Sequence, residues 1–120
     1  MPEEKDKSHL TTNKSGPVTV VEFSDRKILD ELSISEIGDE LGDLVVRNPG
    51  IQLLLNFRNV EHLSSAALGM LITLNKNITA KNGTLKLSDI TPQIYEVFKI
   101  TRLNEVFDIH DTAEHAAKAF

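Results

Sequence analysis

Hydrophobic residues gather along the chain in short runs of branched aliphatic side chains, a pattern that predicts strands. Such runs occupy Val18 to Phe23, Ile51 to Phe57 and Thr84 to Ser88. The second run is apolar almost throughout and is bounded by turn residues, so it predicts a strand covered on both faces. Arg26 to Leu29 predicts a short strand paired with Val18 to Phe23, and Glu105 to Ile109 predicts a brief extended segment.

The first helix is predicted from apolar residues that follow Ser33 at helical spacing. Ser33 and Glu36 form a capping box, with the serine as N-cap and the glutamate reaching back to it. Gly38 and Gly42 share one face of this helix, although each glycine costs about 1 kcal/mol relative to alanine. Their spacing of four residues predicts close packing against a sheet or a partner.

Three further helices are predicted downstream. Ala66 to Lys81 is the strongest of them, and its predicted buried stripe consists of Ala67, Leu71, Leu74 and Ile78. Thr91 followed by Pro92 predicts a helix start, because threonine is a good N-cap and proline suits the first helical position. Asp111 and Glu114 form a second capping-box pattern before an alanine-rich C-terminal helix.

The order of these elements predicts the α/β class. Alternating strands and helices indicate a mixed, mainly parallel sheet of four to five strands, packed with about four helices. Residues 17–120 are expected to form one domain without internal repeats. Residues 1–16 are polar and charged, and they are expected to form a disordered N-terminal tail.

Charge narrows the class of partner. The formal net charge is −5, which disfavours nucleic acid and anionic membrane surfaces as partners. No apolar run approaches the roughly 18 residues of a membrane span. Between Ile28 and Val46 there is no Lys or Arg but there are six acids: Asp30, Glu31, Glu36, Asp39, Glu40 and Asp43. Two interpretations stay open, a solvated helix face and a surface that meets a basic protein partner.

Motifs for catalysis and for cofactors are missing from the sequence. The chain has no cysteine, which excludes disulfides, thiolate metal sites and cysteine nucleophiles and fits a reducing compartment. The histidines lack the spacing of a zinc protease, and no glycine-rich phosphate loop occurs. Leu63 and Ala67 stand where a nucleophile elbow around Ser65 would need glycine. The sequence therefore predicts a protein that is not an enzyme and that binds neither a metal nor a cofactor.

Ser64 and Ser65 stand where a predicted strand gives way to the helix that begins near Ala66. One or both are expected to cap this helix, since a serine oxygen that accepts a free backbone N–H stabilises a helix by about 1 kcal/mol.

The stretch from Asn56 to Leu71 resembles the signature of the STAS domain, an apolar strand followed by Asp-Ser-Ser/Thr-Gly-Leu-Gly at the start of a long helix. Upstream, Lys27 to Asp30 resembles the Gly-x-Leu-Asp element of that family. Downstream, Asn82 to Leu87 is similar to its Gly-Gly-x-Leu strand. Thr91 to Phe107 is similar to its Pro-x-Val-x-x-x-Phe-x-x-Thr-Gly-Leu-x-x-x-Phe segment. The resemblance extends over the whole chain after the predicted tail.

STAS proteins of this size are anti-anti-sigma factors, cytoplasmic bacterial proteins also called anti-sigma factor antagonists. The resemblance implies that the partner is an anti-sigma factor with serine kinase activity, that this partner phosphorylates Ser65, and that a phosphatase resets the switch. Ser64 is a second candidate acceptor. The resemblance also implies a partner-binding surface that contains Asp30, Ser64, Ser65, Ala67 and Met70.

Three positions depart from the family signature: Ser64 replaces the aspartate, Ala66 the second Ser/Thr, and Ala67 the glycine. The missing aspartate favours an alternative, a phosphorylation-independent STAS interaction subunit of a transporter or a stress-signalling assembly. A nucleotide-binding or hydrolytic protein is a third class, which no phosphate loop supports. The first two hypotheses both remain open at the level of sequence.

Overall fold

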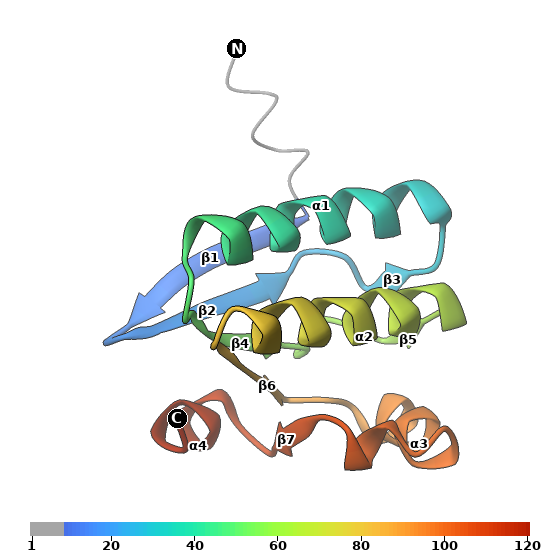
Figure 1. Cartoon of the computed structure of the whole chain (residues 1–120). Helices are drawn as coiled ribbons and strands as arrows, with labels where there is room; N and C mark the ends of the chain where they lie inside the picture. The colour runs from blue at the N-terminus through green and yellow to red at the C-terminus, as the bar shows by residue number, and fades with distance from the viewer. Residues whose placement is uncertain (1–8) are drawn as a thin grey trace.

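Figure 1 shows the computed structural model, which describes residues 9–120. Strands alternate with helices along most of the chain. The strands are β1 (Leu10–Ser15), β2 (Val18–Phe23), β3 (Lys27–Ile28), β4 (Gln52–Asn56), β5 (His62–Leu63), β6 (Thr84–Ser88) and β7 (Asp108–His110). The helices are α1 (Glu31–Arg47), α2 (Ser65–Ala80), α3 (Pro92–Ile100) and α4 (Ala113–Lys118), and a 3-10 turn, η2 (Leu103–Glu105), follows α3.

Five strands form the main sheet, in the order β1-β2-β4-β6-β7. β1 pairs with β2 in antiparallel fashion, and all other neighbours in this sheet are parallel. The mixed, mainly parallel sheet and its four helices confirm the predicted α/β fold. β3 and β5 form a separate two-stranded parallel sheet.

β4 is the central strand, and both of its faces are covered. Leu53 and Leu55 belong to the main hydrophobic core together with residues of α1, α2 and α3, whereas Leu54 packs with Val18 and with Ala116 of α4. All three leucines have zero exposure. The strand covered on both faces is therefore confirmed, with α1 and α2 on one side of the sheet and α4 on the other (Figure 1).

The predicted disordered tail is wrong for residues 10–15, which form β1. This strand is mostly exposed, and only its first residue, Leu10, packs against the main core. It is held by backbone pairing along the whole of β2, and backbone pairing leaves no hydrophobic pattern in a sequence. Gly16 makes the hairpin turn with φ +61°, a conformation that glycine adopts without steric penalty. Residues 1–8 of the expected tail lie outside the described residues.

His9 connects the start of β1 to two other segments. Its Nδ1 lies 2.7 Å from Asp25 Oδ2, in the loop after β2, and its Nε2 lies 2.7 Å from Glu36 Oε1 on α1. Partial burial opposes the charged imidazolium, but the hydrogen bonds with Glu36 and Asp25 outweigh it and raise the pKa of His9 above its ordinary value of 6.5. Both ring nitrogens donate only in the protonated form, so this form holds the two carboxylates together.

Two helices begin at caps other than the predicted ones. Asp30, not Ser33, is the N-cap of α1, and its carboxylate accepts the Ser33 N–H at 3.0 Å. Thr112, not Asp111, caps α4. Neighbouring Asp, Ser and Thr residues all suit an N-cap, and the path of the preceding strand decides which of them has the extended backbone that a cap requires. The predicted Thr91 cap of α3 is confirmed.

The segment predicted to pair with Val18 to Phe23 has a different partner. β3 lies parallel to β5, with Lys27 opposite His62 and Ile28 opposite Leu63. A strand of two residues carries too little pattern to identify its neighbour. The return of the chain after β4 decides the pairing.

The last strand is shorter than the extended segment predicted from Glu105 to Ile109. Glu105 belongs to the 3-10 turn η2, and β7 begins only at Asp108. Of the two residues between them, Phe107 packs against Phe98 of α3 with ring centroids 5.9 Å apart. This aromatic contact holds the turn against α3, and the strand begins at the next residue, Asp108.

α2 ends in close contact with the chain that leads into β4. A Cβ on Gly83 would lie 2.7 Å from the Ile51 carbonyl oxygen and 2.9 Å from Ile78 Cγ2. The Gly83 N–H donates to the Ile78 carbonyl at 2.8 Å, and the Thr84 N–H donates to the Ile51 carbonyl at 2.9 Å. Only glycine fits where the helix end and the start of β6 meet the start of β4.

Gly83→Ala is expected to destabilise the protein by roughly 1–3 kcal/mol, because the new methyl group meets a backbone carbonyl that pairs with Thr84. Urea denaturation measures the loss. The matched control is Gly69→Ala in α2, where a Cβ meets nothing within 4 Å. This control should be neutral or more stable by up to about 1 kcal/mol, and equal effects of the two changes would contradict the close contact.

His9→Gln is expected to lower the free energy of unfolding at pH 6 but to change it little at pH 9. A raised pKa means that the contribution of His9 is fully present below about pH 6.5 and is lost as the pH rises through the folded-state value. Partly exposed ion pairs of this kind contribute about 0.5 to 1 kcal/mol. Urea denaturation at the two pH values checks this, and an effect of the same size at both would rule out the ionic role.

Candidate functional site

Ser64 and Ser65 both lie at the start of α2, but they have different roles. Ser64 is the N-cap, and its Oγ accepts the Ala67 N–H at 3.2 Å. Ser65 is the first helical residue and is exposed, and within residues 9–120 no hydrogen bond engages its hydroxyl. The expectation that one or both serines cap the helix is therefore confirmed for Ser64 alone, and the Ser65 hydroxyl is accessible for modification.

The start of α2 is a favourable place for an anion. The first backbone N–H groups of a helix have no intrahelical acceptor, and the helix dipole adds partial positive charge there. The first turn of α2 contains no acidic residue that would neutralise this charge. A phosphate group on Ser65 would therefore stabilise the first turn of the helix rather than melt it.

Asp30 lies at the same end of the molecule as Ser65. The Ser64 N–H donates to the Ile28 carbonyl at 3.1 Å, which holds the connection from β3 to α1 beside the start of α2 (Figure 1). Hydrogen bonds from Ser33 hold the pKa of the Asp30 carboxyl below its ordinary value. Asp30 is therefore ionised at neutral pH, at the same end of the molecule as the exposed serine.

Two exposed leucines flank Asp30. Leu29 is 48% exposed and Leu32 is 68% exposed. Both fall outside the buried stripe of α1, which comprises Ile34, Ile37, Leu41 and Val45, and this position is the one sign of their exposure in the sequence. Leu29, Asp30, Leu32 and Ser65 together are called the serine surface below.

The remaining predicted contact residues, Ala67 and Met70, lie away from the serine surface. Ala67 has zero exposure and belongs to the main core, so its methyl group faces inward. The structure therefore does not place Ala67 on the surface where a partner was expected to contact it. Met70 is half-buried between α1 and α2, and its Cγ would lie 3.2 Å from a Cβ on Gly38. The predicted close packing of Gly38 is thus made against a neighbouring helix of the same chain.

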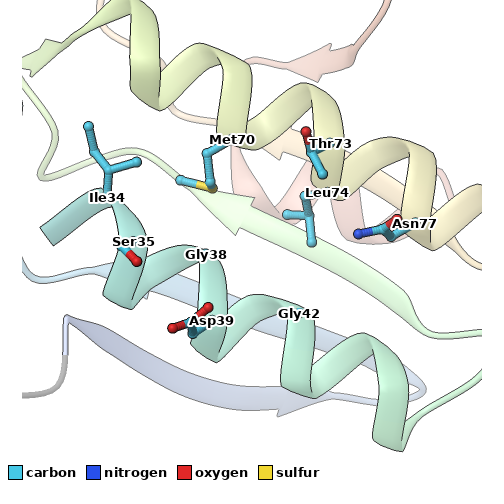
Figure 2. A pocket seen from close by; sticks show the side chains of 9 residues that line it. All are labelled: Ile34, Ser35, Gly38, Asp39, Gly42, Met70, Thr73, Leu74 and Asn77. Atoms are coloured by element: carbon cyan, nitrogen blue, oxygen red, sulfur yellow. The ribbon is translucent and has the colours of Figure 1, made fainter. Parts of the chain in front are cut away.

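A groove runs between α1 and α2 (Figure 2). It consists of two adjoining hollows of about 330 and 500 Å³. Both hollows are lined by Gly38, Asp39, Gly42 and Asn77. The space bounded by residues 34–46 and residues 70–81 is called the α1–α2 groove below.

A polar cluster lies on the other face of the sheet. Lys86 is 7% exposed and pairs with Asp108, and its Nζ lies 5.2 Å from the centre of the Phe120 ring. The hydrogen bond from Lys86 lowers the pKa of Asp108, as expected for an ion pair that compensates a buried charge. This cluster fastens the C-terminal segment to β6 and β7.

Within residues 9–120, no three His, Cys, Asp or Glu side chains are arranged to hold a metal ion. The same part of the chain contains no helix that is both long and apolar enough to cross a membrane.

The STAS-domain family model matches residues 9–116, and the chain belongs to the STAS-domain family. The match begins at His9, in agreement with β1 as part of the domain.

The relatives of this chain include proteins named as anti-sigma factor antagonists. BtrV of Bordetella bronchiseptica is 29% identical over 69 residues, which is 58% of this chain and 60% of that protein. The anti-sigma-B factor antagonist of Bacillus subtilis is 28% identical over 65 residues, which is 54% of this chain and 60% of that protein. The chain thus matches about 60% of the length of each.

Solved structures share the fold. An anti-sigma-factor antagonist STAS protein from Planctomyces limnophilus has a TM-score of 0.83 at 21% identity, covering 92% of this chain and 96% of that chain. The phosphorylated form of the Bacillus cell fate determinant SpoIIAA has a TM-score of 0.69 at 14% identity, covering 92% and 97%. Part of the murine anion transporter Slc26a9 has a TM-score of 0.74 at 11% identity, covering 97% of this chain and 19% of that one.

Ser64→Ala is expected to destabilise the protein by about 1 kcal/mol, because α2 loses its capping oxygen. Ser65→Ala is the matched control. Its hydroxyl is exposed and caps nothing, so the free energy of unfolding should change by less than about 0.5 kcal/mol. Urea denaturation of both variants checks the assignment, and a larger loss for Ser65→Ala would reverse it.

Proposed function

We propose that this protein is an anti-sigma factor antagonist that binds an anti-sigma factor with serine kinase activity and is released when that partner phosphorylates Ser65. The observation that carries the proposal is the exposed Ser65 hydroxyl at the start of α2, at the same end of the molecule as ionised Asp30 and exposed Leu29 and Leu32. The relatives named as anti-sigma factor antagonists support the same role. A phosphatase that removes the phosphate would restore binding.

The serine surface supplies both parts of such a switch. Unmodified, it offers Leu29 and Leu32 as apolar contacts that a partner can bury. Phosphorylation adds about −1.5 to −2 charges at the same end of the molecule as Asp30, which is already negative. A partner surface that fits the hydroxyl would then bury uncompensated charge, so affinity falls while the STAS fold itself remains intact.

Ser65 is favoured over Ser64 as the acceptor. Ser64 is half-buried, and its Oγ is engaged by the Ala67 N–H. Transfer of a phosphoryl group to Ser64 would esterify the Oγ that accepts the Ala67 N–H, whereas transfer to Ser65 leaves this cap unchanged. The serine at the usual aspartate position thus serves as a structural cap.

The test is phosphorylation by the purified anti-sigma factor kinase and ATP, with the modified position located by mass spectrometry. Wild type and Ser64→Ala should be modified at Ser65, and Ser65→Ala should not be modified. In a binding assay, Ser65→Asp should weaken the complex at least tenfold, and Ser65→Ala should retain it. The proposal is wrong if Ser65 stays unmodified under conditions in which the kinase modifies another substrate.

A second candidate is a phosphorylation-independent subunit of a transporter or stress-signalling assembly. The observation in its favour is the STAS fold within the anion transporter structure, together with Ser64 in place of the signature aspartate. In that case the protein would purify from its host with transporter or assembly subunits, and Ser65→Asp would leave this association unchanged.

A further inference from the structure

We propose that His9 is a positioning residue for the serine surface, and that protonated His9 holds this surface in the arrangement that binds the anti-sigma factor. The affinity for that partner then falls as the pH rises and His9 loses its proton. The inference rests on the proposed function, because it assigns the change in binding to the anti-sigma factor. It adds control by pH to control by phosphorylation.

His9 joins the two ends of a segment that carries most of the serine surface. Its Nδ1 lies 2.7 Å from Asp25 Oδ2, and its Nε2 lies 2.7 Å from Glu36 Oε1. Three of the four members of the serine surface lie on residues 25–36, between these two carboxylates. His9 itself is fixed at the start of β1, because its carbonyl accepts the Ser24 N–H at 2.8 Å. The histidine therefore ties both ends of residues 25–36 to the main sheet.

The same segment is bonded to the chain that leads to Ser65. The Arg26 carbonyl accepts two backbone N–H groups at the entry to β5, at 2.7 and 3.1 Å. The Ile28 carbonyl accepts the Ser64 N–H at 3.1 Å, and β3 pairs with β5 between these points (Figure 1). A movement of residues 25–36 is therefore transmitted to the residue that precedes Ser65.

Loss of the proton from His9 breaks one of its two contacts. Both ring nitrogens donate in the protonated form, whereas the neutral ring has one donor and one acceptor. The carboxylate of Asp25, in the loop after β2, or that of Glu36, on α1, then faces a nitrogen lone pair. That end of residues 25–36 is released from His9.

The charged groups that face His9 are these two carboxylates. They are 29% and 50% exposed, so water can solvate the one that is released. Lys14, the next charged residue along β1, donates to a side chain of β2 instead. Hydrogen bonds within the first turn of α1 lower the pKa of the Asp30 carboxyl, and the charge on His9 lowers it further. The serine surface thus responds to His9 through charge as well as through the backbone.

The change falls in a range of pH that binding experiments can reach. Burial opposes the charged imidazolium, but the hydrogen bonds with Glu36 and Asp25 raise the pKa of His9 above 6.5. Both contacts are therefore present below about pH 6.5, and one is lost as the pH rises through the raised value. A surface already fixed in its bound arrangement loses less conformational freedom on binding, so the protonated form binds more tightly.

NMR of the protein alone tests the link between His9 and the serine surface. As the pH is raised from 5 to 9, the backbone amide signals of Leu29, Asp30 and Ser65 should shift with the midpoint of the His9 ring signal. This component should disappear in His9→Gln. Amide signals of the serine surface that do not follow the His9 midpoint would overturn the positioning role.

Two other histidines provide controls for this titration. His62 is exposed on β5, and any shift that it causes should remain in His9→Gln. His115 is exposed on α4, which covers the opposite face of the sheet. His115→Gln should therefore leave the titration of the serine surface unchanged.

Calorimetry with the purified anti-sigma factor tests the effect on binding. His9→Gln should bind about twofold to fivefold more weakly than wild type at pH 6 and as well as wild type at pH 9, because a partly exposed ion pair contributes this much. The comparison at each pH cancels titration of the partner. His9→Lys keeps its charge and should bind about twofold to fivefold more tightly than wild type at pH 9. An equal loss for His9→Gln at both pH values, or none at pH 6, would contradict the proposal.

The two proposals fail in different ways. If the anti-sigma factor binds, is lost on Ser65→Asp and binds His9→Gln as tightly as wild type at pH 6, the role of His9 is wrong and the proposed function stands. If the anti-sigma factor does not bind wild type at either pH, the proposed function fails. The assignment of the pH effect to that partner then fails with it.

Discussion

The burial of β4 on both faces is the constraint on which the rest of the structure depends. Leu53, Leu54 and Leu55 are consecutive and fully buried, and successive side chains of a strand point to opposite faces. Each buried leucine contributes about 1.5 to 3 kcal/mol, so helices are required on both sides of the sheet. α1 and α2 cover the side of Leu53 and Leu55, and the short α4 covers the side of Leu54.

The placement of α1 and α2 on one face has a consequence at their N-termini. The pairing of β3 with β5, continued by the hydrogen bond from Ser64 N–H to the Ile28 carbonyl, aligns the two helix starts. Each start has its own cap, Asp30 for α1 and Ser64 for α2. Because Ser64 caps α2, the Ser65 hydroxyl takes no part in holding the helix. A residue in that position can carry a phosphate without loss of the fold.

The same pair of helices also leaves the groove. Helices packed on a sheet approach most closely where small residues permit it, and Gly38 permits it against Met70. Gly42 continues the small face without a neighbour to fill it, so the interface opens. Stability within the chain would favour a larger residue there. With glycine there, the space beside Asn77 stays open.

The sequence by itself determined the α/β class, β2, β4, β6, the four helices and the junction at Ser64 and Ser65. These features depend on local periodicity, on caps and on a run of apolar residues, all of which can be identified in the sequence. Tertiary structure alone decided β1, the partner of β3 and the exposure of Leu29 and Leu32. Backbone pairing between distant segments has no residue pattern, and exposure depends on which neighbours cover a side chain. For the same reason the chain shows two glycines four residues apart, but only the packing of α2 shows that one is filled and the other is open.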